Sequence, residues 1–282
     1  MSEFWYHIRR NSMLTIGVIT LLLMVVLWLV GYFAVDIKNA APLSAPTDLP
    51  PSREHPLGTD SAGRELLAVM VAGAPTTLQI GLIAGSLGMI VGTILGFTAG
   101  YFGGVVDAVV RSAADVALTV PALAVLVVIA SVITKTLSPE ILALIIAALA
   151  WMWPTRTIRS QVLTMRERAY VEVARLNGLN NREIIFKELM PNLLPYLAAS
   201  FVGAVSSAVL AAIGLEALGL GPQSEPTLGM TIYWARYYNG LPRGMWWWWA
   251  PPVLIIIFLF IALFMIAAGL DEIANPRARR TT

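Results

Sequence analysis

The sequence predicts an all-α integral membrane protein with six transmembrane helices. Hydrophobic residues make up 57% of its 282 residues and charged residues only 13%, a balance far from that of soluble domains. Apolar runs of about 20 residues, long enough to span a bilayer as helices, recur along the chain. Between two of these runs lies one long polar segment, residues 154–191, which carries seven Arg or Lys and four Glu. Because each charge is costly in hydrocarbon, this segment is expected on the membrane surface.

The first predicted span covers residues 13–35, which carry no charge, and it follows a short head with Arg9 and Arg10. A cleaved signal peptide would have a shorter apolar core and a small-residue cleavage site, so we interpret this run as an uncleaved first helix. The segment 36–75 is rich in proline, which keeps it extended. We expect three units along the chain: an N-terminal unit with head, first helix and loop (1–75), a transmembrane core (76–270) and a tail (271–282).

The second predicted span, residues 77–100, carries glycines at four-residue steps. Spacing by four places small residues on one helix face, where the backbones of two helices can approach closely. We therefore predict that this helix packs tightly against another along a row of glycines. The row consists of Gly81, Gly85, Gly88, Gly92, Gly96 and Gly100.

The third predicted span, residues 116–133, contains Pro121, which is expected to kink it. Just before it, Arg111 and Asp115 lie four residues apart and thus on one helical face. We expect these two side chains to form an ion pair near the membrane surface. A proton relay is the alternative.

The remaining predicted spans are residues 137–153, 192–215 and 250–270. The span 192–215 is rich in Ala, Ser and Gly, which suits either close helix packing or the wall of an aqueous path. Between the last two spans, an outer segment at 216–245 gathers aromatic residues. Aromatic residues near a membrane boundary usually form an interfacial belt, and stacking against a sugar is the alternative. These residues are Tyr233, Trp234, Tyr237 and Tyr238.

Within the polar segment we predict two short helices joined at Gly178. Apolar residues recur at three- and four-residue steps up to Asn177, and the glycine follows as a helix stop. Asn180, with Glu183 three residues later, forms the signature of a capping box at the start of the second helix. Pro191 is expected to end that helix. Two short helices of this kind form a compact knob that is suited to bind a partner.

The triplet at 172–174 is Glu-Val-Ala, and Gly178 and Pro191 follow it. This pattern resembles the EAA loop of permease subunits of ATP-binding-cassette (ABC) importers. In that family the loop is the cytoplasmic coupling helix, which docks into a cleft on the ATPase subunit. By this resemblance, the ATPase-coupling residues are Tyr170, Glu172, Ala174, Arg175, Gly178, Ile184 and Pro191.

Three further stretches resemble the C-type permease subunit of the dipeptide, oligopeptide and nickel branch of these importers. Residues 55–65 spell HPLGTDSAGRE, where the branch has HPLGTDxxGRD. Residues 218–221 spell LGLG as in the branch, although Ala212 stands where peptide-type members carry a glutamate. Residues 269–277 spell GLDEIANPR, where the branch has GLRDxLDPR, so that Asp271 stands at the position of an arginine.

The residue content excludes several site chemistries. The chain has no cysteine, only two histidines (His7 and His55) and no paired intramembrane carboxylates, which leaves nothing from which to build an enzyme site. One imidazole and one carboxylate, His55 and Asp60, do not make a metal coordination shell, and a turn held by Gly58, Asp60 and Arg64 explains them. No G-x-x-x-x-G-K-[ST] loop occurs. ATP and Mg²⁺ are therefore expected on partner subunits, with no cofactor on this chain.

The resemblance implies a type I ABC importer permease fold whose six spans form half of a translocation path. The partners it implies are a second homologous permease, two ABC ATPase subunits and an extracytoplasmic substrate-binding protein, with membrane lipid around the spans. A net charge of +2 does not indicate nucleic-acid binding. In this family the fifth span lines the path, which makes its small and hydroxylated residues the candidates. They are Ser200, Gly203, Ser206, Ser207 and Ala212.

We expect the chain in the inner membrane of a bacterial or archaeal cell, as a multi-pass protein with both termini in the cytoplasm. This orientation places the head, the turn near residue 101, the polar segment and the tail inside. It assigns thirteen Lys or Arg to the inside and six to the outside. Because positive residues favour the cytoplasmic side, the count supports this orientation.

The predicted function is that of a permease subunit of a binding-protein-dependent importer for a short oligomeric solute. An ion-coupled secondary transporter is the alternative. Such transporters usually hold ionisable residues near the midplane, whereas the span centres here are almost free of charge. The departures from the family pattern at Ala212, Glu216 and Asp271 favour a short oligosaccharide, with an oligopeptide as the second possibility.

Overall fold

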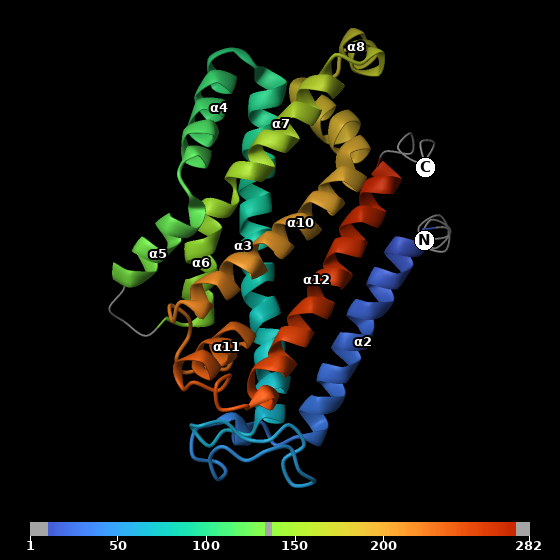
Figure 1. The fold of residues 1–282 in the computed structure, drawn as a ribbon. Coiled ribbons are helices and arrows are strands. Elements are labelled where there is room, and N and C mark those ends of the chain that lie inside the picture. The colour runs from blue at the N-terminus through green and yellow to red at the C-terminus, as the bar shows by residue number, and fades with distance from the viewer. Residues whose placement is uncertain (1–10, 133–136, 275–282) are drawn as a thin grey trace.

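The computed structural model describes residues 11–132 and 137–274, and the secondary structure in these ranges is helical (Figure 1). Four helices are long and apolar enough to cross a membrane, and up to six spans result if each of two bent helix pairs is one span. The elements are α2 (Ser12–Ala34), η1 (Ile37–Ala40), α3 (Leu66–Phe102), α4 (Gly104–Thr119), α5 (Ala122–Val132), α6 (Pro139–Ala150), α7 (Met152–Arg166), α8 (Ala169–Leu176), α9 (Asn181–Glu183), η2 (Ile184–Leu189), α10 (Met190–Ala217), α11 (Leu228–Tyr237) and α12 (Trp246–Ala274).

Helix α3 runs through the centre of the bundle, and the predicted glycine row lies at its contacts with other helices (Figure 1). A Cβ atom added at Gly85 would lie 2.7 Å from the Cα atom of Val205 on α10. One added at Gly88 would lie 2.5 Å from the Cβ atom of Ala150 on α6, and the glycines further along face α7. The prediction of close packing is therefore confirmed. α3 extends the predicted span at both ends, so residue 75 lies inside it.

The third predicted span differs from expectation, because it is broken rather than kinked. α4 and α5 meet at Val120 and Pro121 with a bend of 79°. Proline lacks an N–H group and clashes with the preceding turn, and here the helix stops and restarts. Residue 133, the predicted end of this span, lies outside the described residues, as do the head with Arg9 and Arg10 and the tail from residue 275.

The polar segment also differs from expectation at both of its ends. Its first part belongs to α7, which bends by 41° from α6 and packs Ile158 and Val162 against α3. The predicted first knob helix is thus two helices, α7 and α8, separated at residues 167–168. Pro191 does not end a helix, because the helical path continues from residue 181 to 217. A π-helical turn at η2 precedes the proline, and Pro191 then occupies the first turn of α10, a position at which proline is tolerated.

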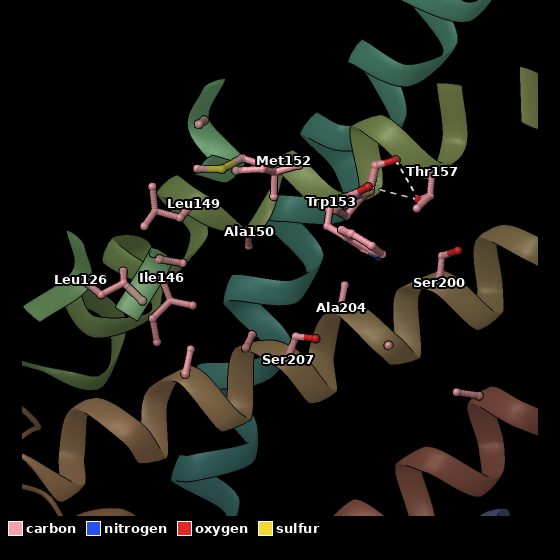
Figure 2. Close-up of a pocket in the computed structure, with 18 of the residues that line it drawn as sticks. Leu126, Ile146, Leu149, Ala150, Met152, Trp153, Thr157, Ser200, Ala204 and Ser207 are labelled. Atoms are coloured by element: carbon pink, nitrogen blue, oxygen red, sulfur yellow. Dashed lines mark hydrogen bonds between the residues drawn. The ribbon is translucent and has the colours of Figure 1, made fainter. Parts of the chain in front are cut away.

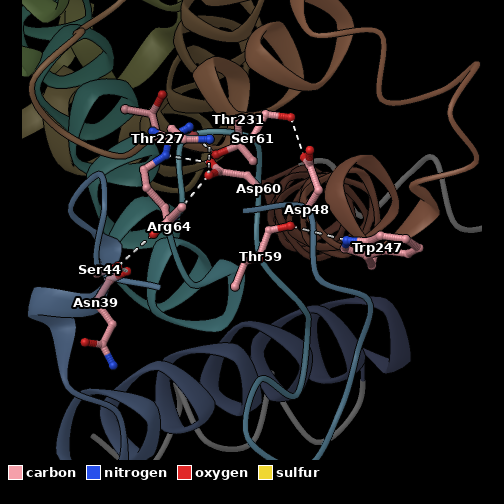
Figure 3. A network of polar contacts seen from close by, with 12 residues as sticks. Asn39, Ser44, Asp48, Thr59, Asp60, Ser61, Arg64, Thr227, Thr231 and Trp247 are labelled. Carbon is pink, nitrogen blue, oxygen red and sulfur yellow. Dashed lines mark hydrogen bonds and ion pairs between the residues drawn. The ribbon is translucent and has the colours of Figure 1, made fainter. Parts of the chain in front are cut away.

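At the opposite end of the bundle, the loop between α2 and α3 packs against the segment around α11 (Figure 3). The Asp60 carboxylate accepts hydrogen bonds from the backbone N–H groups of Ala62 and Arg64 and from the Arg64 side chain. Gly58 supplies a positive φ of 69°. The predicted turn is therefore confirmed. Among the described residues no group of three or more His, Asp or Glu is placed to hold a metal ion.

Candidate functional site

The knob, defined here as residues 169–189, is shaped by two helix caps. Gly178, at a φ of +82°, donates its N–H to the Arg175 carbonyl, while the N–H of Leu179 reaches the Ala174 carbonyl. These two hydrogen bonds together form a Schellman motif, which glycine favours because it tolerates the left-handed conformation. Asn180 and Glu183 then form the predicted capping box, with both hydrogen bonds at 3.0 Å. The turn between α8 and the following helix is thus tightly defined.

One face of the knob is anchored on α3 and α7. Val171, Ala174, Ile184 and Leu189 are buried in a cluster with side chains of those helices. The hydroxyl of Tyr101, at the end of α3, donates to the Asn181 side chain at 2.9 Å, and the Arg175 guanidinium lies 6.0 Å from the centre of the Tyr101 ring. The predicted coupling residues Ala174 and Ile184 therefore belong to the anchor.

The opposite face of the knob is apolar and exposed. Val173 is 55% exposed, Leu176 is 81% exposed, and Phe186 on η2 is 63% exposed. Tyr170 continues the row one turn before Val173, and its partial burial raises the pKa of its phenol above the ordinary value. The other predicted coupling residues, Glu172, Arg175, Gly178 and Pro191, are also exposed. This face is suited to bind a partner, since removal of such exposed apolar side chains from water lowers the free energy.

A first cavity of about 600 Å³ lies beside the middle of α10 (Figure 2). Its floor is the face of α10 that carries the small residues, and its walls come from α4 to α7 with two residues of α12. The predicted path residues Ser200, Gly203 and Ser207 line it. Ser206 instead donates to the Val202 carbonyl at 2.8 Å, and Ala212 is fully buried in the packed core.

A second cavity of about 980 Å³ opens at the end of the bundle that holds the knob. It lies between the start of α2, the end of α7, the start of α10 and the end of α12. Three residues line both cavities: Tyr196, Ala267 and Asp271. The two cavities therefore adjoin, and together they follow α10 from its middle to the knob end.

Two features near the opposite end were not predicted from sequence. Glu216 is fully buried against Gly221 and Gly229, and within the described ranges neither of its oxygens has a hydrogen bond of ordinary geometry. The sequence marked Glu216 only as a departure from the family pattern and as a single charge at the end of an apolar run, and neither signal indicated that it is buried. The outer aromatic residues stack mainly on one another, as Tyr233 does on Tyr237 with ring centres 5.8 Å apart.

Comparison with known proteins places the chain in a family. A family model described as binding-protein-dependent transport system inner membrane component matches residues 92–280. A putative peptide transport system permease protein of Brucella abortus is 30% identical over 279 residues, covering 97% of this chain and 90% of the relative. The oligopeptide permease protein OppC and the dipeptide permease protein DppC of Bacillus subtilis are 27% and 28% identical, covering 96% and 99% of this chain and 88% and 86% of the relatives.

A solved structure of the MetNI methionine ABC transporter in an inward-facing conformation is similar in fold. The TM-score is 0.58 at 17% sequence identity, and the match covers 74% of this chain and 95% of that chain. The expected type I importer permease fold is thereby confirmed, and the family match favours a permease over an ion-coupled secondary transporter. The chain belongs to the family of binding-protein-dependent transport system inner membrane components, as a permease of the ABC importer type.

Proposed function

We propose that the chain forms half of a translocation path for short peptides and that the knob couples this path to an ATPase subunit. The names of the similar permeases support peptides as the substrate class in preference to oligosaccharides. The two adjoining cavities along α10 provide a path of suitable position. The chain itself contributes no catalytic group in this proposal.

The exposed apolar row on the knob is the observation that carries the coupling role. Leu176 and Val173 point away from the bundle, while Val171 and Ala174 on the same short helix are buried in it. A helix with two apolar faces, one covered and one open, is suited to transmit force between the bundle and a second protein. A docked ATPase would bury the open face of this helix. Movement of the ATPase would then be transmitted through the helix to its buried face, which is anchored on the bundle.

The assembly follows from the family and the geometry. In our proposal a second homologous permease supplies the other half of the path, two ATPase subunits bind ATP and Mg²⁺, and an extracytoplasmic binding protein delivers the solute. The knob then faces the cytoplasm of a bacterial or archaeal cell, with both termini on the same side. The ends of α2 and α12 support this arrangement, since Leu14 packs against Gly269 at the end of the bundle that also holds the knob (Figure 1).

The coupling role is tested with a charge placed on the open face. Leu176→Glu is expected to abolish co-purification of the ATPase and the ATPase activity stimulated by loaded binding protein, because a carboxylate would be buried at the docked interface. Val105→Glu is the matched control, since Val105 is 80% exposed, lies near the same end and is outside the knob. Normal coupling in Leu176→Glu, or equal loss in the control, would contradict the proposal.

The substrate class is tested with the complete assembly in lipid vesicles. Binding protein loaded with di- to pentapeptides is expected to stimulate ATP hydrolysis and uptake, and binding protein offered xylo- or cello-oligosaccharides is not. Stimulation by saccharides alone would replace peptides with the oligosaccharide expected from the sequence departures. Absence of stimulation by either class would refute the proposed substrate range.

A further inference from the structure

Asp271 lies where the two cavities meet. It is an exposed residue near the end of α12, and it lines the first cavity together with Ser200 and Ser207 of α10. Among the described residues it is the one charged side chain on the wall of that cavity, whose other polar side-chain groups are hydroxyls and the indole N–H of Trp153. A solute that passes from one cavity to the other therefore passes this carboxylate.

The carboxylate of Asp271 is available to a solute. In the ranges 11–132 and 137–274 no hydrogen bond or ion pair to its side chain is present, whereas the neighbouring Glu272 accepts a hydrogen bond of 2.7 Å from Asn11. The second cavity is also lined by Arg168, which lies between α7 and α8. That cavity thus contains both signs of charge, while the junction itself carries a negative charge.

The sequence at this position reverses the charge of the resembled pattern. The GLRDxLDPR ending has an arginine where this chain has Asp271. Exchange of a cation for an anion changes the local charge by two units. In a path with low-dielectric walls a single charge acts on a passing ion more strongly than it would in bulk water, because the walls focus its field.

We propose that Asp271 is a specificity-determining residue that favours peptides with a basic side chain. The lysine ammonium or arginine guanidinium of such a peptide would bind the carboxylate at the cavity junction, while a peptide with an acidic side chain would be repelled there. This inference rests on the proposed function, since it names a subclass of the same peptide substrate. Every unblocked peptide carries an amino terminus, so the discrimination lies in the side-chain charge.

The test compares three tripeptides in vesicles that contain the complete assembly with saturated binding protein. ATP-dependent uptake of Ala-Lys-Ala, Ala-Ala-Ala and Ala-Glu-Ala is measured for the wild type and for Asp271→Asn, Asp271→Glu and Asp271→Arg. The same binding protein serves all variants, so the ratio of wild-type to variant rates for each peptide removes the contribution of the binding protein. Glu225→Gln is the control, because Glu225 is exposed and lines neither cavity.

The expected result is a charge-dependent ratio. For Asp271→Asn the wild-type to variant ratio should be about two- to fivefold for Ala-Lys-Ala, close to one for Ala-Ala-Ala, and below one for Ala-Glu-Ala. Asp271→Glu should retain the wild-type preference, Asp271→Arg should invert it, and added salt should reduce the differences. Equal ratios for all three peptides with normal peptide uptake would overturn this inference and leave the proposed function intact. Absence of uptake of every peptide by the wild type would overturn both.

Discussion

The contact between α3 and α10 leaves no room for a side chain at Gly85, which makes this residue a sharp test of the packing argument. A Cβ atom there would lie 2.7 Å from the Cα atom and 2.8 Å from the backbone nitrogen of Val205. Ordinary contacts between carbon atoms are about 3.5–4.0 Å. Both neighbouring atoms belong to helix backbone, so the side chain cannot turn away, and the two helices must separate by about 1 Å.

Gly85→Ala is therefore expected to lower the free energy of unfolding by about 1–3 kcal/mol, the usual range for overpacking of a tight interior. The assay is the melting temperature of the detergent-purified assembly, followed by loss of the monodisperse peak after heating. A decrease of roughly 2–4 °C per kcal/mol is expected for a chain of this size.

Gly203→Ala is the matched control for this experiment. Gly203 also lies in a long apolar helix, but its added Cβ atom would meet nothing within 4 Å, because it faces the first cavity. Its melting temperature should stay at or slightly above that of the wild type, since alanine favours the helix more than glycine. A wild-type melting temperature in Gly85→Ala, or an equal decrease in Gly203→Ala, would refute the claim that the glycine row sets the distance between the helices.

Three further predictions follow from named contacts. Asp107→Asn leaves Arg159 without its ion-pair partner, and the two side chains are only 20% (Asp107) and 17% (Arg159) exposed. The substitution should destabilise the assembly by about 1–3 kcal/mol in the same melting assay. A double variant in which the two charges are exchanged should recover part of this loss. Asn180→Ala removes the N-cap of the second knob helix and should lower the stability of that helix by about 1 kcal/mol. It should therefore speed amide hydrogen exchange in residues 169–189, whereas Asn180→Ser, which keeps a capping side chain, should not. Partial burial would raise the pKa of Asp48, but hydrogen bonds from Arg243 and Ser61 and the charge of Arg243 outweigh burial and hold this pKa below the ordinary 3.8. Arg243→Gln should therefore lower the stability of the assembly at neutral pH. This difference between variant and wild type should disappear as the pH falls through the lowered pKa of Asp48.

The features predicted correctly from the sequence are those with a local cause. Glycines at four-residue steps share a helix face whatever surrounds them, so the row along α3 could be predicted without knowledge of its partners. The stop at Gly178 and the capping box at Asn180 depend on hydrogen bonds within a few residues, and both are present in the structure. The knob was therefore predicted together with its turn.

The features that were missed depend on distant parts of the chain. Ile158 and Val162 fit the apolar spacing of a surface helix, but the small glycines of α3 offer them a deeper contact, so α7 joins the bundle instead of the knob. Whether Pro121 kinks or breaks its helix depends on the contacts available to each half, which the sequence does not reveal. The burial of Glu216 likewise results from the packing of α10 against the segment around Gly229.

The helical path from residue 181 to 217 connects the knob to the cavity in one piece, and this length determines how movement is amplified. Nineteen residues separate Ile184 in the anchored part of the knob from Gly203 at the cavity floor, which corresponds to about 28 Å along a helix. A tilt of about 10° at the knob would therefore displace the cavity floor by about 5 Å, close to one helical turn. A displacement of this size at Gly203 would also disturb the contact between Val205 and Gly85, so the packing along the glycine row limits how far α10 can move at the cavity.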